Sequence, residues 1–280
     1  MRVEGHLAHD EPRWGRAMKF IEVDDGGEQT VVLVHGGNVA GWMWGQQLAA
    51  LKEFHLLVPD LPGFGASNDE SWVSQSDAAD RLAELIADRA RGGTAHVVGL
   101  SLGAGVAIHL AARNPTRVTS LLISSTSAAP PSRAARAIGR AMLVAWNRRW
   151  FWRALSRGYG LPADSVDLFV DTGLGIRRDT ALTVFDEATG GFTPEQLAAV
   201  RVPTLAVAGS RDTAAVRSLE PIRRHVAGAL LATAPGMHHQ WNIENTDLFN
   251  AMVVEWITKS TIADGLVNTT ASEGRQSQRE

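Results

Sequence analysis

The stretch AHVVGLSLGAGVAIHLAAR, residues 95–113, decides the fold of this 280-residue chain. A short apolar run leads to Ser101, and the segment Leu102–Arg113 that follows is rich in alanine and leucine and contains no proline. Residues of this kind favour a helix. Gly99 and Gly103 frame the serine and permit a sharp turn with close approach of strand and helix. The stretch therefore predicts a strand, a tight turn and a helix, with the Ser101 hydroxyl exposed at the turn.

A serine in this position has two interpretations. It can cap the N-terminus of the helix by accepting a backbone N–H. It can also be a nucleophile, because GLSLG (99–103) matches the G-x-S-x-G pattern in which the hydroxyl stands on a strained strand-to-helix turn. The N-terminus of the helix would favour an oxyanion beside it. Since a predicted strand precedes the motif and a predicted helix follows it, the nucleophile is the favoured interpretation of Ser101.

The same order of strand and helix recurs along the chain. Strands are predicted at 30–35, 55–60, 96–101, 118–125, 203–209 and 229–234, and helices at 43–53, 76–91, 102–113, 214–226 and 246–259. Most of these strands are apolar without strict alternation, as expected for strands covered on both faces. The sequence therefore predicts the α/β class, with a mostly parallel central sheet wrapped by helices. Ligands of such sheets bind at the carboxyl ends of the strands.

One interval breaks the alternation. Residues 127–201 contain no convincing strand and read as helices with glycine and proline breaks, which predicts a helical cap, or lid, inserted into a core formed by 1–126 and 202–260. The last stretch, 261–280, is mostly polar and is expected to be a mobile tail.

Composition narrows the classes of function. The net charge of −3 gives no sign of a nucleic-acid or membrane partner, and the chain has no cysteine for disulfides or thiolate metal sites. Its N-terminus lacks the apolar segment of a signal peptide, and no apolar run approaches the roughly 20 residues that span a bilayer. We expect a soluble, cytoplasmic protein. Neither a metal cluster nor a dinucleotide fingerprint is evident, so we expect no metal and no cofactor.

Other polar residues follow predicted strands and would meet Ser101 at one edge of the sheet. Asp212 ends one strand, where it can be a helix cap or an orienting acid. His238 and His239 follow the last predicted strand, and a histidine that takes the serine proton would activate the hydroxyl. The glycines after the first strong strand would let the Gly37 N–H, together with the N–H of Leu102, bind a developing oxyanion. Residue types alone leave the choice between the two histidines open.

Five motifs in order, HGGNVAGWMW (35–44), PDLPGFGAS (59–67), GLSLGAG (99–105), VAGSRD (207–212) and HHQWNIENTDLF (238–249), resemble the α/β-hydrolase superfamily in its small form with a cap. The resemblance covers about residues 18–258. It implies the α/β-hydrolase fold, Ser101 as nucleophile, Asp212 as acid, a late histidine as base and an oxyanion hole from the backbone of Gly37 and Leu102. In this family the base commonly lies five residues before a glutamate, so Glu244 selects His239.

The resemblance implies serine-dependent hydrolysis of an ester, thioester or lactone of a mid-sized hydrophobic substrate through an acyl-enzyme. Two alternatives remain. The same residues serve elimination, cyclisation, acyl transfer or C–C cleavage in natural-product tailoring enzymes of this superfamily, and a non-catalytic ligand receptor can be built on the same fold.

The cap segment adds two features. Between residues 127 and 160 there are seven arginines and no acid; they are Arg133, Arg136, Arg140, Arg148, Arg149, Arg153 and Arg157. These form either a solvated basic face or a surface for an anionic group or an acidic carrier protein. Four tryptophans, Trp42, Trp146, Trp150 and Trp241, are either core residues or part of an apolar substrate pocket.

Overall fold

The computed structural model describes residues 18–159, 161 and 163–270. Its centre is an eight-stranded sheet with the order β1-β3-β2-β4-β5-β6-β7-β8. The strands are β1 (Phe20–Val23), β2 (Thr30–Val34), β3 (His55–Pro59), β4 (Ala95–Leu100), β5 (Val118–Ser124), β6 (Thr204–Gly209), β7 (Leu230–Ala234) and β8 (Val267–Asn268). The six from β2 to β7 run parallel, and only β1 and β8 at the edges are antiparallel to their neighbours. The predicted mostly parallel α/β sheet is confirmed.

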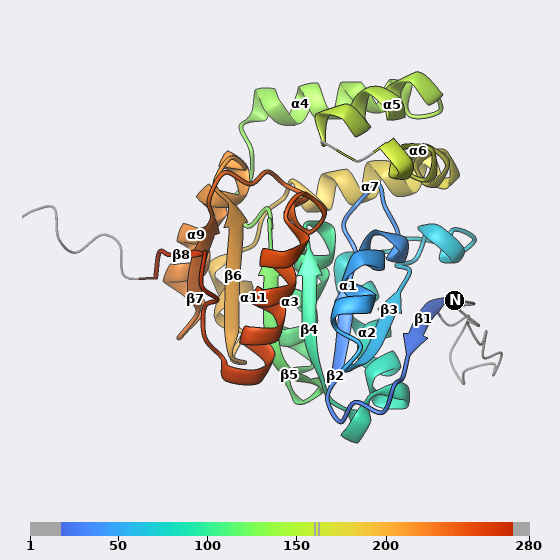
Figure 1. Cartoon of the computed structure of the whole chain (residues 1–280). Helices are drawn as coiled ribbons and strands as arrows, with labels where there is room; N and C mark the ends of the chain where they lie inside the picture. Colours follow the sequence, from blue (N-terminus) through green and yellow to red (C-terminus); the bar gives the residue numbers. More distant parts are fainter. Residues whose placement is uncertain (1–17, 160, 162, 271–280) are drawn as a thin grey trace, which may run out of the picture.

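Helices cover both faces of the sheet (Figure 1). The helices of the body are α1 (Gly45–Ala50), α2 (Gln75–Arg89), α3 (Leu102–Arg113), α8 (Pro194–Ala198), α9 (Thr213–His225), α10 (Trp241–Glu244) and α11 (Thr246–Lys259). Helices α1 and α11 contact each other on one face, while α3 contacts α2 and α8 on the other. Every residue of β2, β3, β4 and β6 is buried in consequence, which explains the lack of polar alternation in these strands.

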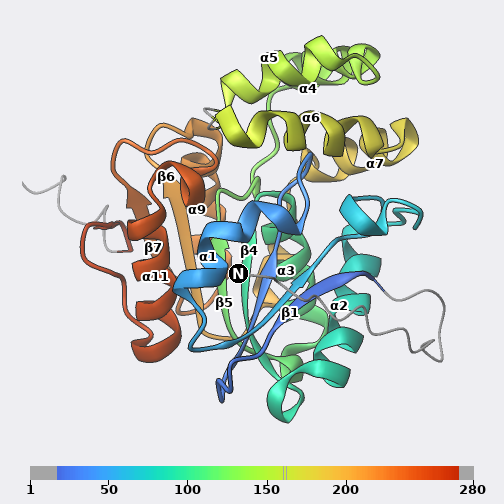
Figure 2. The ribbon, with the colours of Figure 1, turned by 45° about the vertical axis from the view of Figure 1, so that its right-hand side comes forward.

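Between β5 and β6 the chain leaves the sheet and forms a layer of helices above the carboxyl ends of the strands (Figures 1 and 2). The layer consists of α4 (Arg133–Met142), the 3₁₀ turn η5 (Leu143–Ala145), α5 (Arg149–Gly158), α6 (Val166–Gly175) and α7 (Arg178–Ala188). Helix α8 also falls within 127–201, but it contacts α3 and α9 of the body. We therefore propose that the cap ends, in space, before α8.

Two features of the ends differ from the sequence prediction. The edge strands β1 and β8 were not predicted, because segments of four and two residues carry too little periodic signal. The expected mobile tail, 261–280, does not begin at residue 261: Thr233 of β7 pairs with Val267, and Thr269 N–H donates to the Leu231 carbonyl at 2.8 Å. Residues 271–280 lie outside the described residues.

The two glycines beside Ser101 have a steric role in this fold. A Cβ on Gly103 would collide with the carbonyl oxygens of Val34 and His35, and one on Gly99 would lie 2.5 Å from the carbonyl oxygen of Gly103. Helix α3 therefore packs against β2 and β4 at a distance that only glycine permits.

We expect Gly103→Ala to lower the free energy of unfolding by about 1–3 kcal/mol, because the new methyl group must displace backbone atoms of a packed strand. Urea denaturation followed by tryptophan fluorescence measures this. The matched control is Gly45→Ala at the start of α1, where a Cβ meets nothing within 4 Å and φ is −51°. Equal stability of the two variants would contradict the close-packing role.

Candidate active site

Ser101 stands on a strained turn between β4 and α3. Its backbone has φ 57° and ψ −113°, a conformation that residues other than glycine rarely adopt. The turn is held because Ser101 N–H donates to the Ser124 carbonyl of β5 at 2.9 Å. The side chain accepts no backbone hydrogen bond as a cap, so the capping interpretation of this serine fails. Its hydroxyl is instead directed towards a histidine.

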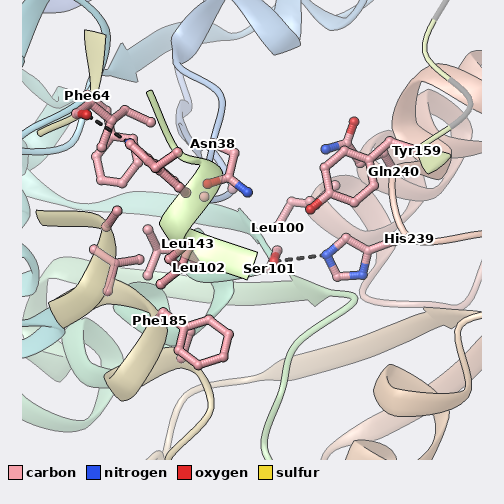
Figure 3. Close-up of a pocket in the computed structure, with 17 residues that line it drawn as sticks. Asn38, Phe64, Leu100, Ser101, Leu102, Leu143, Tyr159, Phe185, His239 and Gln240 are labelled. Atoms are coloured by element: carbon pink, nitrogen blue, oxygen red, sulfur yellow. Dashed lines mark hydrogen bonds between the residues drawn. The ribbon is translucent and has the colours of Figure 1, made fainter. Parts of the chain in front are cut away.

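That histidine is His239. Its Nε2 lies 2.9 Å from Ser101 Oγ, as Figure 3 shows, and its Nδ1 lies 2.6 Å from Asp212 Oδ2. His238 points elsewhere: its ring is 55% exposed and its Nδ1 lies 2.9 Å from Glu244 Oε1. Glu244 also accepts the His238 backbone N–H at 2.8 Å, which fixes the loop. The geometry therefore joins Ser101, His239 and Asp212 in one chain of contacts and leaves His238 outside it.

Asp212 caps a helix and also contacts His239. One carboxylate oxygen accepts the Ala215 N–H at 3.1 Å as the cap of α9, and the other faces His239. Burial acts to raise the pKa of Asp212, but the hydrogen bond and charge of His239 and the backbone N–H groups of α9 outweigh it and hold the pKa below its usual value. The side chain is thus an ionised carboxylate in contact with His239 Nδ1, on the side of the ring opposite Ser101.

The loops that carry Asp212 and His239 are tied together. Arg211 N–H donates to the Met237 carbonyl, Ser210 N–H donates to the Ala234 carbonyl, and Ser210 Oγ accepts the Gly236 N–H. A Cβ on Gly209 would collide with the carbonyl oxygens of Met237 and His238, so the two loops touch directly. These contacts hold Asp212 and His239, which are far apart in the sequence, in a fixed position relative to each other.

The loop after β2 lies across the turn from His239. Gly37 and Leu102 both line the cavity beside Ser101, and Leu102 begins α3, where backbone N–H groups have no partner within the helix. His35 fixes this loop: its Nδ1 donates to the Gly36 carbonyl at 2.7 Å, and its Nε2 accepts the Leu61 N–H at 2.9 Å. Burial lowers the pKa of His35, which keeps the ring neutral and suited to a structural role.

Ser101 and His239 open into a cavity of about 160 Å³ beneath the cap. Most of its wall is apolar and comes from the body and from the cap, where it includes residues at η5, at the end of α6 and in α7: Phe64, Leu100, Leu102, Leu143, Trp146, Ile176, Ala181, Val184, Phe185 and Ala188. The polar lining side chains, besides Ser101 and His239, are those of Asn38, Tyr159 and Gln240. Figure 3 shows Phe64, Leu143 and Phe185 on one side and Tyr159, Gln240 and His239 on the other.

The four tryptophans named from the sequence have different positions. Trp146 lines the cavity, and its indole N–H donates to the Ile176 carbonyl at 3.0 Å, so only carbon faces the ligand space. Trp241 does not line the cavity: it is fully buried and donates to Ser124 Oγ at 2.9 Å. Trp150 is 65% exposed on the cap, and Trp42 bonds Thr172 of α6. Of these four tryptophans, Trp146 lines this cavity, whereas Trp42, Trp150 and Trp241 do not.

Several lining residues were not predicted. Tyr159 is the only tyrosine of the chain, and it comes from the end of α5 in the cap. Asn38 adopts φ 67°, and Gln240 directly follows His239. Asn38 directly follows the glycines of the HGG motif (35–37). These positions in the sequence are the signal that could have identified Asn38 and Gln240. No such signal marks Tyr159, because the path of the cap decides where it lies.

Within the described residues no group of three or more histidine, aspartate or glutamate side chains could hold a metal ion. No helix in the described part of the chain has the length and apolar content needed to cross a membrane.

Comparison with known proteins agrees with this geometry. Residues 31–252 match the model of the alpha/beta hydrolase family. A curated AB hydrolase superfamily protein from Gibberella zeae is 32% identical over 259 residues, which cover 88% of this chain and 86% of the relative. A pimeloyl-[acyl-carrier protein] methyl ester esterase from Nitrosomonas europaea is 41% identical over 98 residues, covering 34% of this chain and 37% of that enzyme.

A solved structure gives the same result in three dimensions. The crystal structure of a hydrolase from Pseudomonas aeruginosa superposes with a TM-score of 0.73 at 25% identity, covering 85% of this chain and 93% of that one. The family model spans more than half of the chain, and the Gibberella relative matches along most of its length. The strained serine turn, the sheet that carries it and these matches together show that the chain belongs to the alpha/beta hydrolase family and is a hydrolase.

Proposed function

We propose that the protein hydrolyses a carboxylic ester, or a related thioester or lactone, with Ser101 as nucleophile, His239 as general base and Asp212 as the acid that orients it. The supporting observation is the unbroken chain from Ser101 Oγ through the His239 ring to Asp212 Oδ2, with separations of 2.9 and 2.6 Å. The relative from Nitrosomonas europaea, named as a methyl ester esterase, supports ester hydrolysis as the reaction.

The proposed reaction follows from these contacts. His239 Nε2 takes the Ser101 proton as Oγ attacks the substrate carbonyl, and the Gly37 and Leu102 N–H groups bind the oxyanion that forms. The intermediate collapses when His239 returns the proton to the departing oxygen or sulfur, which leaves an acyl-enzyme. Water then attacks the acyl carbon in the same way, and the acid is released. Asp212, ionised throughout, stabilises the imidazolium that forms twice.

The cavity favours a substrate with an apolar acyl part. Its walls are mainly aliphatic and aromatic, and the indole N–H of Trp146 is already bonded within the cap. Burying an apolar acyl chain against such walls contributes roughly 25 cal/mol per Å². The same residues could serve elimination, cyclisation, acyl transfer or C–C cleavage, and these remain the alternative. A receptor without catalysis would not need the aligned serine and histidine.

A fluorophosphonate probe tests the activated serine. We expect the wild-type protein to be labelled and Ser101→Ala to be neither labelled nor active on 4-nitrophenyl butanoate, because the attack on phosphorus or carbon needs a serine hydroxyl whose proton a neighbouring base accepts. Peptide mass spectrometry should place the label on Ser101. An unlabelled wild-type protein that is folded and has an accessible cavity would contradict the proposed function.

The two adjacent histidines give a matched pair. His239→Ala should lower kcat by about 10³-fold or more, since removal of one member disables the serine, base and acid unit as a whole. His238→Ala, which removes a half-exposed ring bonded to Glu244, should retain kcat within about threefold. Kinetics on 4-nitrophenyl butanoate measure both. The reverse pattern would assign the base to His238.

The arginine-rich cap supports a narrower proposal about the substrate carrier. Four of its seven arginines pair within the protein: Arg136 and Arg140 with Asp186, Arg149 with Asp171, and Arg153 with Asp167. In the described part of the chain Arg133, Arg148 and Arg157 have no acidic partner, and exposed apolar side chains accompany them, namely Ile138, Met142, Val144 and Trp150. We propose that this surface accepts an acidic acyl carrier protein, by analogy with the esterase relative.

A cytoplasmic location of the protein remains a prediction.

Reversing the three unpaired charges tests the carrier proposal. Arg133→Glu, Arg148→Glu and Arg157→Glu together should raise KM for an acyl-carrier-bound ester by about tenfold or more while leaving the kinetics on 4-nitrophenyl butanoate unchanged. The control makes the same charge change on the body, at Lys52, Arg201 and Arg217, which are exposed. Equal KM values for the two triple variants would contradict a carrier surface on the cap.

A further inference from the structure

The polar side chains of the cavity gather at one end. Tyr159 and Gln240 lie on the side of His239 (Figure 3), and Asn38 joins them through a hydrogen bond with Tyr159, whereas the remaining lining side chains, apart from Ser101, are apolar. Buried polar groups are costly unless they are hydrogen-bonded, so a polar end in an otherwise apolar cavity needs a reason. A ligand that supplies the missing hydrogen bonds provides one.

Gln240 is the clearest case. Gln240 lines the cavity and is only 5% exposed, and its Oε1 is buried with no hydrogen-bond partner among the described residues. The backbone is firmly placed, because its carbonyl accepts the N–H groups of Ile243 and Glu244 at the start of α10. The residue is therefore held beside the cavity with a buried acceptor that no described residue satisfies. A turn of the side-chain amide towards the cavity would let a hydrogen-bond donor on a bound molecule satisfy it.

Tyr159 and Asn38 complete the polar end. The Tyr159 ring stacks on the His239 imidazole, with centroids 6.4 Å apart and an interplanar angle of 25°. Burial raises the pKa of Tyr159 more than its hydrogen bond with Asn38 lowers it, so the phenol stays protonated and remains a donor at neutral pH. Asn38 reaches this position from a left-handed backbone conformation at φ 67°. The cap, the loop after β2 and the loop after β7 thus each contribute one polar side chain.

The chemistry of the proposed function says which part of a substrate meets this end. The carbonyl oxygen is directed to the N–H groups of Gly37 and Leu102, so the departing oxygen must lie near His239 Nε2, the group that protonates it. Atoms attached to that oxygen then extend past the imidazole towards Tyr159 and Gln240. The acyl chain, on the other side of the carbonyl carbon, occupies the apolar part.

We propose that Asn38, Tyr159 and Gln240 form a hydrogen-bonding subsite for the leaving group, so that the preferred substrates are esters of an apolar acid with a polar alcohol that carries its own donor. This inference rests on the proposed function. In the step concerned, the bond from the acyl carbon to the alcohol oxygen breaks, its electron pair goes to that oxygen, and His239 supplies the proton. The alcohol leaves with its donor bonded to Gln240 Oε1.

Two esters of equal size and equal acyl group test this subsite. Propyl butanoate and 2-hydroxyethyl butanoate differ by a terminal methyl in place of a hydroxyl. We expect the wild-type enzyme to hydrolyse the hydroxyethyl ester with kcat/KM about tenfold higher, because only that ester satisfies the buried acceptor. A ratio of one, or a preference for the propyl ester, in an enzyme that fluorophosphonate labels would overturn the subsite and leave the proposed function standing. An unlabelled enzyme would overturn both.

Variants locate the effect. Gln240→Leu, which is similar in size, should bring the ratio of the two kcat/KM values close to one, and Tyr159→Phe, which removes only the hydroxyl, should lower it. Gln46→Leu on the exposed surface of α1 makes the same chemical change outside the cavity and should keep the wild-type ratio. Reaction with the probe shows which variants are folded. A wild-type ratio in both Gln240→Leu and Tyr159→Phe would also overturn the assignment.

Discussion

The close approach of α3 to β2 and β4 is the constraint on which the rest of the site depends. Gly103 lies against the carbonyl oxygens of Val34 and His35, and Gly99 lies against Gly103. With no side chain between them, helix and strand meet at a turn too tight for an ordinary conformation, and Ser101 takes φ 57°. That strain is useful, because it presents the hydroxyl at the carboxyl edge of the sheet and next to unpaired N–H groups at the start of the helix.

The histidine and the acid reach the serine because their loops are joined at the adjacent strands. Backbone hydrogen bonds link the loop after β6 to the loop after β7, and Gly209 allows the two to touch. The carboxylate of Asp212 makes two contacts at once: one oxygen caps α9 and the other faces His239. The position of Asp212 allowed either a helix cap or an orienting acid, and its contacts are those that both roles require.

The cap gives the site its shape rather than its reactive groups. Leu143, Trp146 and the residues of α7 form the apolar wall, and Tyr159 closes the cavity above His239. Much of the basic character of the cap is neutralised internally, because Asp186 on α7 takes both Arg136 and Arg140 and holds α4 against that helix. The acids that pair with the arginines lie later in the chain, so the sequence of residues 127–160 alone overstated the unpaired positive charge of the cap.

The sequence by itself determined the six parallel strands, the main helices of the body and the residues able to form the reactive chain, because each has a local signature. Apolar runs mark buried parallel strands, α3 and α11 have the predicted bounds, and Ser101, Asp212 and the histidine pair each follow a strand. The spacing to Glu244 favoured His239 only through the family resemblance; the tertiary structure decided which histidine faces Ser101, since either of two adjacent loop residues can be directed towards it. It also decided that Tyr159 and Gln240 line the cavity while Trp150 and Trp241 do not. Side-chain environment depends on contacts between elements distant in the chain, and no local pattern contains that information.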